Sequence, residues 1–250
     1  MKALRLPGVS ALVLVVLLLL LWQGVFMAAG PDAIAAPAQT LAYLAEQLRG
    51  PDFWQHIWAT GQAFLIALAI AILGGLALGL VTGLSATATE TAEPLLLALN
   101  SIPKIALYPV VLLLFGIGLP AKVAFGAIHG IIPVAIFTMN ACRAIPPVLG
   151  KTARVMRLSR ADRIRSILLP SALPDIVTGI RLGFSLTLIG TILGEMFGSQ
   201  SGLGYLLMTS IGLQNTQVIM AVTVLLVAFA ASVSTALLAW ERALRRVRGR

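Results

Sequence analysis

The stretch GQAFLIALAIAILGGLALGLVTGL, residues 61 to 84, carries no charged side chain. A helix of about 20 predominantly apolar residues spans the hydrocarbon core of a bilayer. No water is available there, so each backbone N–H and C=O group must find its partner within the same element. The stretch therefore predicts a transmembrane helix, and the rest of the chain repeats the pattern.

Five further apolar runs have the length of a membrane span. They predict helices over Val9–Met27, Pro94–Phe115, Ala121–Ala141, Ile176–Phe197 and Val218–Trp240. The composition agrees with this prediction. The chain is 59% hydrophobic and 11% charged, with a mean hydropathy of +0.98, whereas soluble domains are about 45–50% apolar and about 25% charged. We therefore predict an all-α membrane protein with about six transmembrane helices.

The spans divide the chain into four parts. A helix with a short basic start occupies 1–30, a periplasmic segment 31–60, a five-helix core 61–240 with a loop at 142–175, and a basic tail 241–250. The first run could instead be a cleaved signal peptide, because Lys2 and Arg5 precede it and small residues end it. Its apolar part is longer than the usual run of about 7–15 residues, which favours a retained helix.

The 18 Lys and Arg residues are distributed unevenly between the two sides of the predicted bundle. Fourteen lie in the N-terminal start, the 142–175 loop and the tail, whereas only Arg49 and Lys122 lie on the opposite side. The positive-inside rule assigns the larger group to the cytoplasm, so both termini are predicted to be cytoplasmic. The tail is expected to meet anionic membrane lipid, and no nucleic-acid partner is expected.

Pairs of glycines four residues apart allow membrane helices to approach closely. The chain has four such pairs, at Gly75–Gly79, Gly79–Gly83, Gly179–Gly183 and Gly190–Gly194. We expect them to pack helices of this chain against one another rather than to form a dimer seam.

The loop CRAIPPVLGKTARVMRLSRADRIRSILLPSALPD, residues 142 to 175, is too long for a simple connection. Prolines near both of its ends are expected to interrupt the flanking helices. Between them we predict two short helices, over 149–157 and 160–168. Ser159 and Asp162 have the spacing of a capping box, in which the hydroxyl accepts from a free backbone N–H and the carboxylate reaches back to the cap. The apolar side chains here need a partner, either this chain's own helix ends or another subunit.

Three stretches, taken together with the six spans, resemble one known family. They are LNSIPKIALYPVVLLLFGIG (99–118), ILLPSALPDIVTGIRLG (167–183) and GEMFGSQSGLGYLL (194–207). In this order they resemble the permease subunit of bacterial ABC importers, within the nitrate/sulfonate/taurine branch. The resemblance covers about residues 60 to 240 and implies an ABC importer type I permease-like bundle in the bacterial inner membrane.

The resemblance also implies partners. Such a permease is expected to pair with a second, identical copy, to bind two cytoplasmic ABC ATPase subunits, and to receive solute from a periplasmic or lipid-anchored binding protein. ATP would bind to the ATPase subunits, so this chain is expected to bind no cofactor and no metal and to be no enzyme. The solute would be nitrate, a sulfonate, taurine or a similar anion, although relatives in this branch also carry vitamin-precursor heterocycles and aromatic acids.

In the family, the loop between the fourth and fifth helices couples the permease to the ATPase. The corresponding residues here are Lys151, Ala153, Arg154, Arg157, Ser159, Leu169 and Pro170. Two depart from the family pattern, because Lys151 stands where glutamate is usual and Arg157 where glycine is usual. A non-glycine residue in the left-handed conformation costs roughly 1 kcal/mol or more. Either Arg157 bears this strain or the turn differs.

Polar and helix-breaking residues within the spans are candidates for the translocation path. Asn100 and Pro103 lie in the third predicted helix, and Glu195 lies near the outer end of the fifth. Ionisable groups in a span are costly and suggest a function, but Glu195 could instead hydrogen-bond the glycine-rich turn that follows it. Lys104 and Arg181 are expected to extend to the inner headgroups.

The sequence contains no phosphate-binding glycine loop and no nucleophile–base pair on its water-exposed stretches. If transport is driven by ATP, the ATP site must belong to another subunit. Two alternatives remain open without the resemblance. One is a self-powered carrier or channel, which usually has internal repeats that we do not find here, and the other is a membrane scaffold that recruits a cytoplasmic enzyme through the loop.

Overall fold

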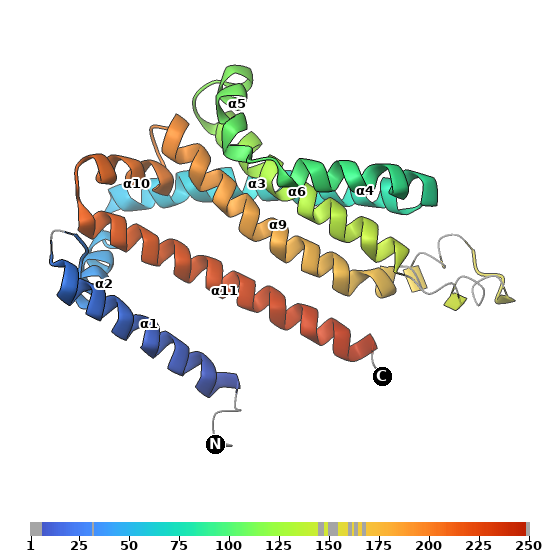
Figure 1. Cartoon of the computed structure of the whole chain (residues 1–250), viewed down its shortest axis with the longest axis horizontal. Coiled ribbons are helices and arrows are strands. Elements are labelled where there is room, and N and C mark those ends of the chain that lie inside the picture. Colours follow the sequence, from blue (N-terminus) through green and yellow to red (C-terminus); the bar gives the residue numbers. More distant parts are fainter. Residues whose placement is uncertain are drawn as a thin grey trace.

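The computed structural model describes residues 7–31, 33–144, 148–149, 155–159, 162, 165–166 and 169–248. In chain order the helices within them are α1 (Pro7–Ala29), α2 (Pro37–Gln47), α3 (Pro51–Gly83), α4 (Ala86–Ser101), η2 (Lys104–Leu107), α5 (Tyr108–Phe115), α6 (Leu119–Arg143), α9 (Leu169–Gly198), α10 (Leu203–Gly212) and α11 (Thr216–Arg248). Figure 1 shows an elongated bundle with α10 at one end, and with the end of α6 and the start of α9 at the other. We call these the α10 end and the linker end, and residues 144–168 the linker.

Five of the six predicted spans are confirmed as apolar helices, and the third is a bent pair of helices. Five helices in the described residues, α1, α3, α6, α9 and α11, are long and apolar enough to cross a membrane. Helix α4 and the segment η2–α5 are long and apolar enough only when taken together, as one bent span. Most observed helices extend beyond the predicted bounds. Helix α3, for example, already begins at Pro51, within the predicted periplasmic segment.

The third span is not the straight helix predicted for Pro94–Phe115. Its two parts are bent by 84° at the break between Ser101 and Lys104. Ile102 is extended, with φ −64° and ψ 131°, because a following proline disfavours the helical conformation. Pro103 itself has no N–H to offer a helix ladder. Figure 1 shows α5 standing out from the bundle beyond this break.

Helix α6 forms the centre of the bundle, packed more extensively against α3 and α9 than any other helices pack on each other. Glycines permit this approach. A Cβ atom added to Gly79 of α3 would lie 2.5 Å from the Ala135 carbonyl oxygen, and one added to Gly183 of α9 would lie 2.5 Å from a methyl group of Val134. The glycine pairs thus pack helices within this chain, as predicted. Helix α6 adds Gly126 and Gly130, a pair with the same spacing that the sequence analysis did not identify.

Helix α1 lies apart from this core. It contacts α2, and the Trp22 indole N–H donates to the carbonyl oxygen of Ala35, just before α2, at 3.0 Å. Within residues 12–29 no side chain is buried, and Figure 1 shows α1 separated from α3, α6 and α9. In this chain the apolar surface of α1 is therefore left for lipid or for another protein.

Helix α9 begins at Leu169 and not, as predicted, at Ile176. Pro170 and Pro174 therefore lie inside its first two turns instead of separating it from the loop. The first four N–H groups of a helix have no partner within it, so Pro170 loses no hydrogen bond there and Pro174 forgoes only one. At the α10 end, α2 and the ten-residue helix α10 are elements that the prediction of six spans did not include.

Candidate functional site

A cluster of polar side chains is buried at the α10 end. Glu195 of α9 has 0% exposure, and its Oε2 accepts hydrogen bonds from the Thr60 hydroxyl at 2.7 Å and from the Gly204 N–H at 3.0 Å. Its Oε1 lies 3.3 Å from the Nζ of Lys122 on α6. A buried carboxylate is stable only when it is both paired and hydrogen-bonded, and Glu195 meets both conditions.

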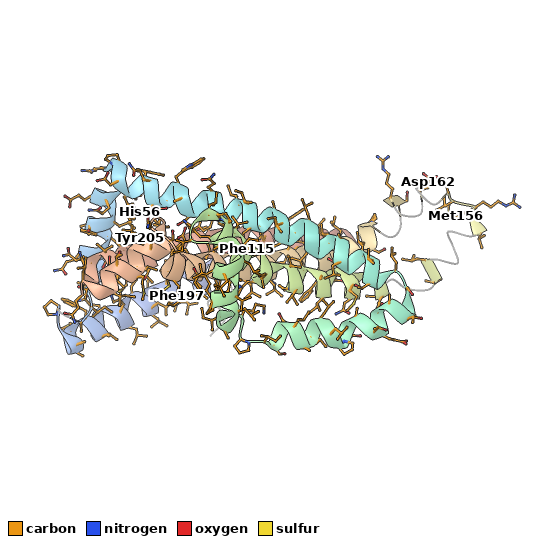
Figure 2. All side chains as sticks on the ribbon, turned by 90° about the horizontal axis from the view of Figure 1, so that it is seen from above. His56, Phe115, Met156, Asp162, Phe197 and Tyr205 are labelled. Carbon is orange, nitrogen blue, oxygen red and sulfur yellow. The ribbon has the colours of Figure 1, made fainter. Side chains whose placement is uncertain are left out.

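The same side chains hold the loop between α9 and α10. The Thr60 hydroxyl accepts from the Leu203 N–H at 2.7 Å, and Lys122 Nζ donates to the Ser201 carbonyl oxygen at 2.9 Å. His56 Nδ1 accepts from the Gly202 N–H at 3.0 Å. We call His56, Thr60, Lys122 and Glu195 the α10-end cluster. Figure 2 shows His56 near Tyr205 at this end of the molecule.

Gly202 is required at its position in this loop for two reasons. Its φ of +115° lies in a region that side chains rarely adopt. A Cβ atom there would also run into the carboxylate of Glu195. The glycine-rich turn is thus shaped to close over the buried carboxylate.

The three path candidates lie in two places. Glu195 contacts the glycine-rich turn, which is the alternative that the sequence left open. Asn100 and Pro103 are exposed and lie at the break between α4 and η2. Tyr108 follows this break, and its hydroxyl donates to the Gly194 carbonyl oxygen at 2.7 Å, so the break is connected to α9 beside Glu195. A role for these residues in a path stays a prediction.

Lys122 is the partner that the sequence analysis missed, because it was counted as a charge of an outer segment. It is 3% exposed in the first turn of α6, with its side chain inside the bundle. One signal was present: Lys122 and Glu195 carry opposite charges near the same predicted end of two spans. The sequence does not tell which spans are neighbours, so this signal alone did not pair them.

Arg181 and Lys104, which are expected to extend to the inner headgroups, both contact polar groups of this chain, and their extension to the headgroups stays a prediction. The Nε of Arg181 lies 3.4 Å from Glu241 on α11, and Arg245 joins Glu241 to Asp175 at the start of α9. These ion pairs tie α11 to α9 near the linker end. Lys104 donates to the carbonyl oxygen of Asn100 at 3.1 Å, at the break in the third span.

The linker contains five of the seven predicted coupling residues. Lys151, Ala153 and Arg154 lie outside the described residues, as does most of the two predicted short helices. Arg157 is described, and its φ of +50° is left-handed. Of the two alternatives, the structure therefore shows a strained Arg157. Leu169 and Pro170 form the start of α9.

The Ser159–Asp162 pair is in contact. The Ser159 hydroxyl accepts from the Asp162 N–H at 3.1 Å and donates to its carboxylate at 2.6 Å. The hydroxyl half of the predicted capping box is thus confirmed. The carboxylate bonds the Ser159 hydroxyl, where the prediction had it reach the backbone of the cap.

Replacing Arg157 with glycine is expected to stabilise the linker turn by about 1 kcal/mol, because glycine adopts positive φ without a steric cost. Hydrogen exchange of the amides in 155–159 is expected to slow accordingly. Gln214, with φ +54° in the turn between α10 and α11, offers a matched control, since Gln214→Gly should protect only its own turn. Faster exchange in 155–159 of Arg157→Gly would contradict the strain.

A family model, the binding-protein-dependent transport system inner membrane component, matches residues 71–248. The chain belongs to this family. The matched region begins within α3 and contains the linker, the break in the third span, and Lys122 and Glu195 of the α10-end cluster. The permease is accordingly the membrane subunit of an ABC importer.

Curated relatives agree in their transport class. The permease is 29% identical to the putative aliphatic sulfonates transport permease protein SsuC of Bacillus subtilis (strain 168), with 83% of this chain and 73% of the relative covered. It is 28% identical to the taurine transport system permease protein TauC of Escherichia coli (strain K12), with 76% and 71% covered. It is 31% identical to the riboflavin transport system permease protein RibX of Chloroflexus aurantiacus, with 85% and 80% covered.

A solved structure supports the fold. A chain from the MetNI methionine ABC transporter in an inward-facing conformation superimposes with a TM-score of 0.65 at 24% identity, covering 76% of the permease and 94% of that chain. The bundle therefore has the fold of an ABC importer permease, as the sequence predicted. The six candidate spans and the family together make the permease a multi-pass protein of the inner membrane.

Proposed function

We propose that this permease imports a small anion, such as a sulfonate, taurine or nitrate, by alternating access. Two copies enclose the path, a periplasmic or lipid-anchored binding protein delivers the solute to the α10 end, and two ATPase subunits bind ATP and act on the linker end. Both termini are then cytoplasmic, and the chain itself binds no cofactor. The relatives named for sulfonate and taurine support the substrate class.

The observation that carries the coupling to an ATPase is the exposed apolar surface of the linker. Val155 is 83% exposed and Met156 63% exposed. Figure 2 shows Met156 and Asp162 beyond the ends of the helices, at the opposite end from His56 and Tyr205. Exposed apolar side chains on a projecting segment favour a protein partner.

The packing of the bundle gives a route from the linker to the path. The linker joins α6 to α9, and these two helices pack on each other more extensively than any other pair. The ion pairs of Arg181 and Arg245 connect α9 to α11 close to the same end. A rigid displacement of the linker would therefore move the central helices as packed bodies, which is the kind of motion that alternating access requires.

A second copy is supported by apolar side chains on and after α5. Leu113 is 87% exposed, and Leu114 and Ile117 are each 73% exposed. They lie beyond the bend of 84°, on the part that Figure 1 shows standing out from the bundle. Together with the uncovered α1, this surface provides area for a partner permease.

The double variant Val155→Asp/Met156→Asp is expected to lose its ATPase. The tagged full-length permease is extracted in mild detergent from its native membrane, and co-purifying subunits are identified by mass spectrometry. Wild type should recover an ATP-binding subunit with a P-loop, and the variant should recover less than about a tenth as much, because burying two carboxylates in an interface costs more than 1.4 kcal/mol, a factor of ten.

A matched control is Leu213→Asp, which places a charge on an equally exposed leucine at the α10 end and should keep the ATPase. All variants must elute like wild type in size-exclusion chromatography. If wild type recovers no ATPase under several mild conditions, the self-powered carrier becomes the better reading. If the double variant keeps its ATPase, the linker is not the docking element.

A further inference from the structure

Lys104 lacks a counter-charge within the described part of the chain. Its side chain is half-buried at the break in the third span, and its ammonium donates to the Asn100 carbonyl oxygen at 3.1 Å. The ion pairs of the described residues join other groups and do not include it. A lysine ammonium has three N–H donors, so two of them have no bonded partner in these residues.

Contacts between the third span and α6 fix the depth of Lys104. Towards the linker end, Glu93 of α4 pairs with Arg143 at 2.7 Å, and Leu96 packs on Met139 one turn further in. These two contacts place the middle of α4 beside the last turns of α6. Lys104 follows Leu96 by eight residues and so lies well away from the linker end.

On the other side of the break, the Tyr108 ring lies 4.9 Å from the Phe125 ring, and Phe125 lies 4.6 Å from His129. Lys104 lies in the chain between Leu96, which packs on Met139, and Tyr108, which packs on Phe125, so it lies between these two levels of α6. His129 is about 15 Å along α6 from its start at Leu119 and about 21 Å from its end, at 1.5 Å per residue. Lys104 therefore lies near the middle of the membrane.

An unpaired ammonium at this depth cannot face lipid tails without a large cost, and ionisable groups in such places line paths or pair with a ligand. Its stem is too short to carry the charge to either headgroup layer from the middle of α6. The ammonium must therefore meet either a water-filled path or a polar partner that the described residues do not supply.

The surface beside Lys104 offers further donors. Asn100 is exposed, and its amide N–H₂ group has no hydrogen-bond partner in the described residues. The imidazole of His129 is 8% exposed and is held behind the break, with Nδ1 2.8 Å from the Phe125 carbonyl oxygen. No carboxylate forms an ion pair with this surface in the described residues. Amide and ammonium N–H groups with no carboxylate paired to them suit the oxygens of an oxyanion.

We propose that Lys104 and Asn100 form an anion-binding station halfway along the translocation path, where a sulfonate or nitrate group supplies the counter-charge of Lys104. The station rests on the proposed function for its place in a path, and it adds to that function a site within the membrane subunit. The binding protein would then select the solute first, and Lys104 would select for anions a second time, at the break in the third span.

Charge-selective labelling of a nearby cysteine tests the station. Cys142 is the only cysteine of the chain and is replaced by alanine, and Ser101→Cys places a near-isosteric thiol beside Asn100 and Lys104. Membrane vesicles with the full-length permease and its co-expressed ATPase are treated with anionic sulfonatoethyl methanethiosulfonate or cationic trimethylammonioethyl methanethiosulfonate. The first reagent carries the sulfonate group that the station is proposed to bind.

The ratio of anionic to cationic labelling rates is expected to fall by about tenfold or more in Lys104→Gln, because a unit charge acts strongly over a few ångströms in a protein interior. Lys104→Arg should keep the ratio. Arg49→Gln removes an exposed charge at the α10 end and should also keep it. With Lys104 intact, methanesulfonate should slow the anionic reagent, and the neutral dimethyl sulfone should not.

A ratio that Lys104→Gln leaves unchanged would overturn the station. The station would also be overturned if neither reagent labels the thiol of Ser101→Cys, because Lys104 would then be covered by lipid phosphate or by a second copy of the chain. If Lys104→Gln fails to fold, the station is tested by whether methanesulfonate slows anionic labelling of the parent with Lys104 intact. ATP-driven uptake of taurine and nitrate by the parent vesicles separates the two proposals. If uptake is absent while the ratio of labelling rates still depends on Lys104, only the proposed function is contradicted.

Discussion

Lys122→Met is expected to lower the free energy of unfolding of the permease by about 3–5 kcal/mol, the usual cost of removing one partner of a buried ion pair. Glu195, with 0% exposure, would remain without the ammonium that lies 3.3 Å away. The Ser201 carbonyl oxygen would lose its hydrogen bond of 2.9 Å as well. The loop between α9 and α10 would therefore loosen together with the helix contacts beneath it.

Unfolding by SDS from mixed micelles, followed by circular dichroism, measures this loss. Arg49→Met removes an exposed cation at the same end of the bundle and should change stability by less than about 0.5 kcal/mol. The double variant Lys122→Met/Glu195→Gln should be more stable than Lys122→Met alone, because neutralising both partners leaves no unpaired charge. Losses that simply add in the double variant would show that the two side chains do not act as a pair.

The fold could be predicted from the sequence to the extent that it depends on apolar length. Runs such as 61–84 leave a helix as the only structure that satisfies its backbone in lipid, and all six runs are helical. The bend in the third span could be predicted only in part. Pro103 marked a break, but its direction depends on the contact of Tyr108 with Gly194, which joins residues far apart in the chain.

The candidate site was harder to predict from the sequence, because its contacts also join residues far apart in the chain. Glu195 was recognised because a carboxylate in an apolar run is conspicuous, whereas its partner Lys122 lies 73 residues away. Arg157 shows the opposite case. Its left-handed φ was one of two alternatives that the sequence left open, because the family pattern has glycine there and a turn of one or two residues is a local property. Lys104 needed the structure, since the sequence alone does not tell its depth in the membrane.

Gly130→Leu is expected to lower the free energy of unfolding by about 3 kcal/mol or more, at the upper end of overpacking costs. A Cβ atom at Gly130 would lie 2.8 Å from the Ala71 Cβ of α3 and 3.1 Å from the Gly183 carbonyl oxygen of α9. The hydroxyl of Thr187 would be closer still, but it can rotate away. Neither the Ala71 Cβ nor the backbone of α9 can yield in this way, so both neighbouring helices must move.

Gly61→Leu makes the same chemical change in α3 where no atom lies within 4 Å of the added Cβ. Gly61 borders a cavity of ≈ 140 Å³ lined by apolar side chains, among them Phe64 and Leu188. Leucine is a better helix former than glycine by nearly 1 kcal/mol, so this variant should be neutral or more stable than wild type. If the free energy of unfolding in SDS falls for Gly130→Leu and does not fall for Gly61→Leu, the packing of α6 leaves no room for a side chain at Gly130. Equal effects would mean that the bundle accommodates bulk between its central helices, and the proposed movement of these helices as packed bodies would lose its basis.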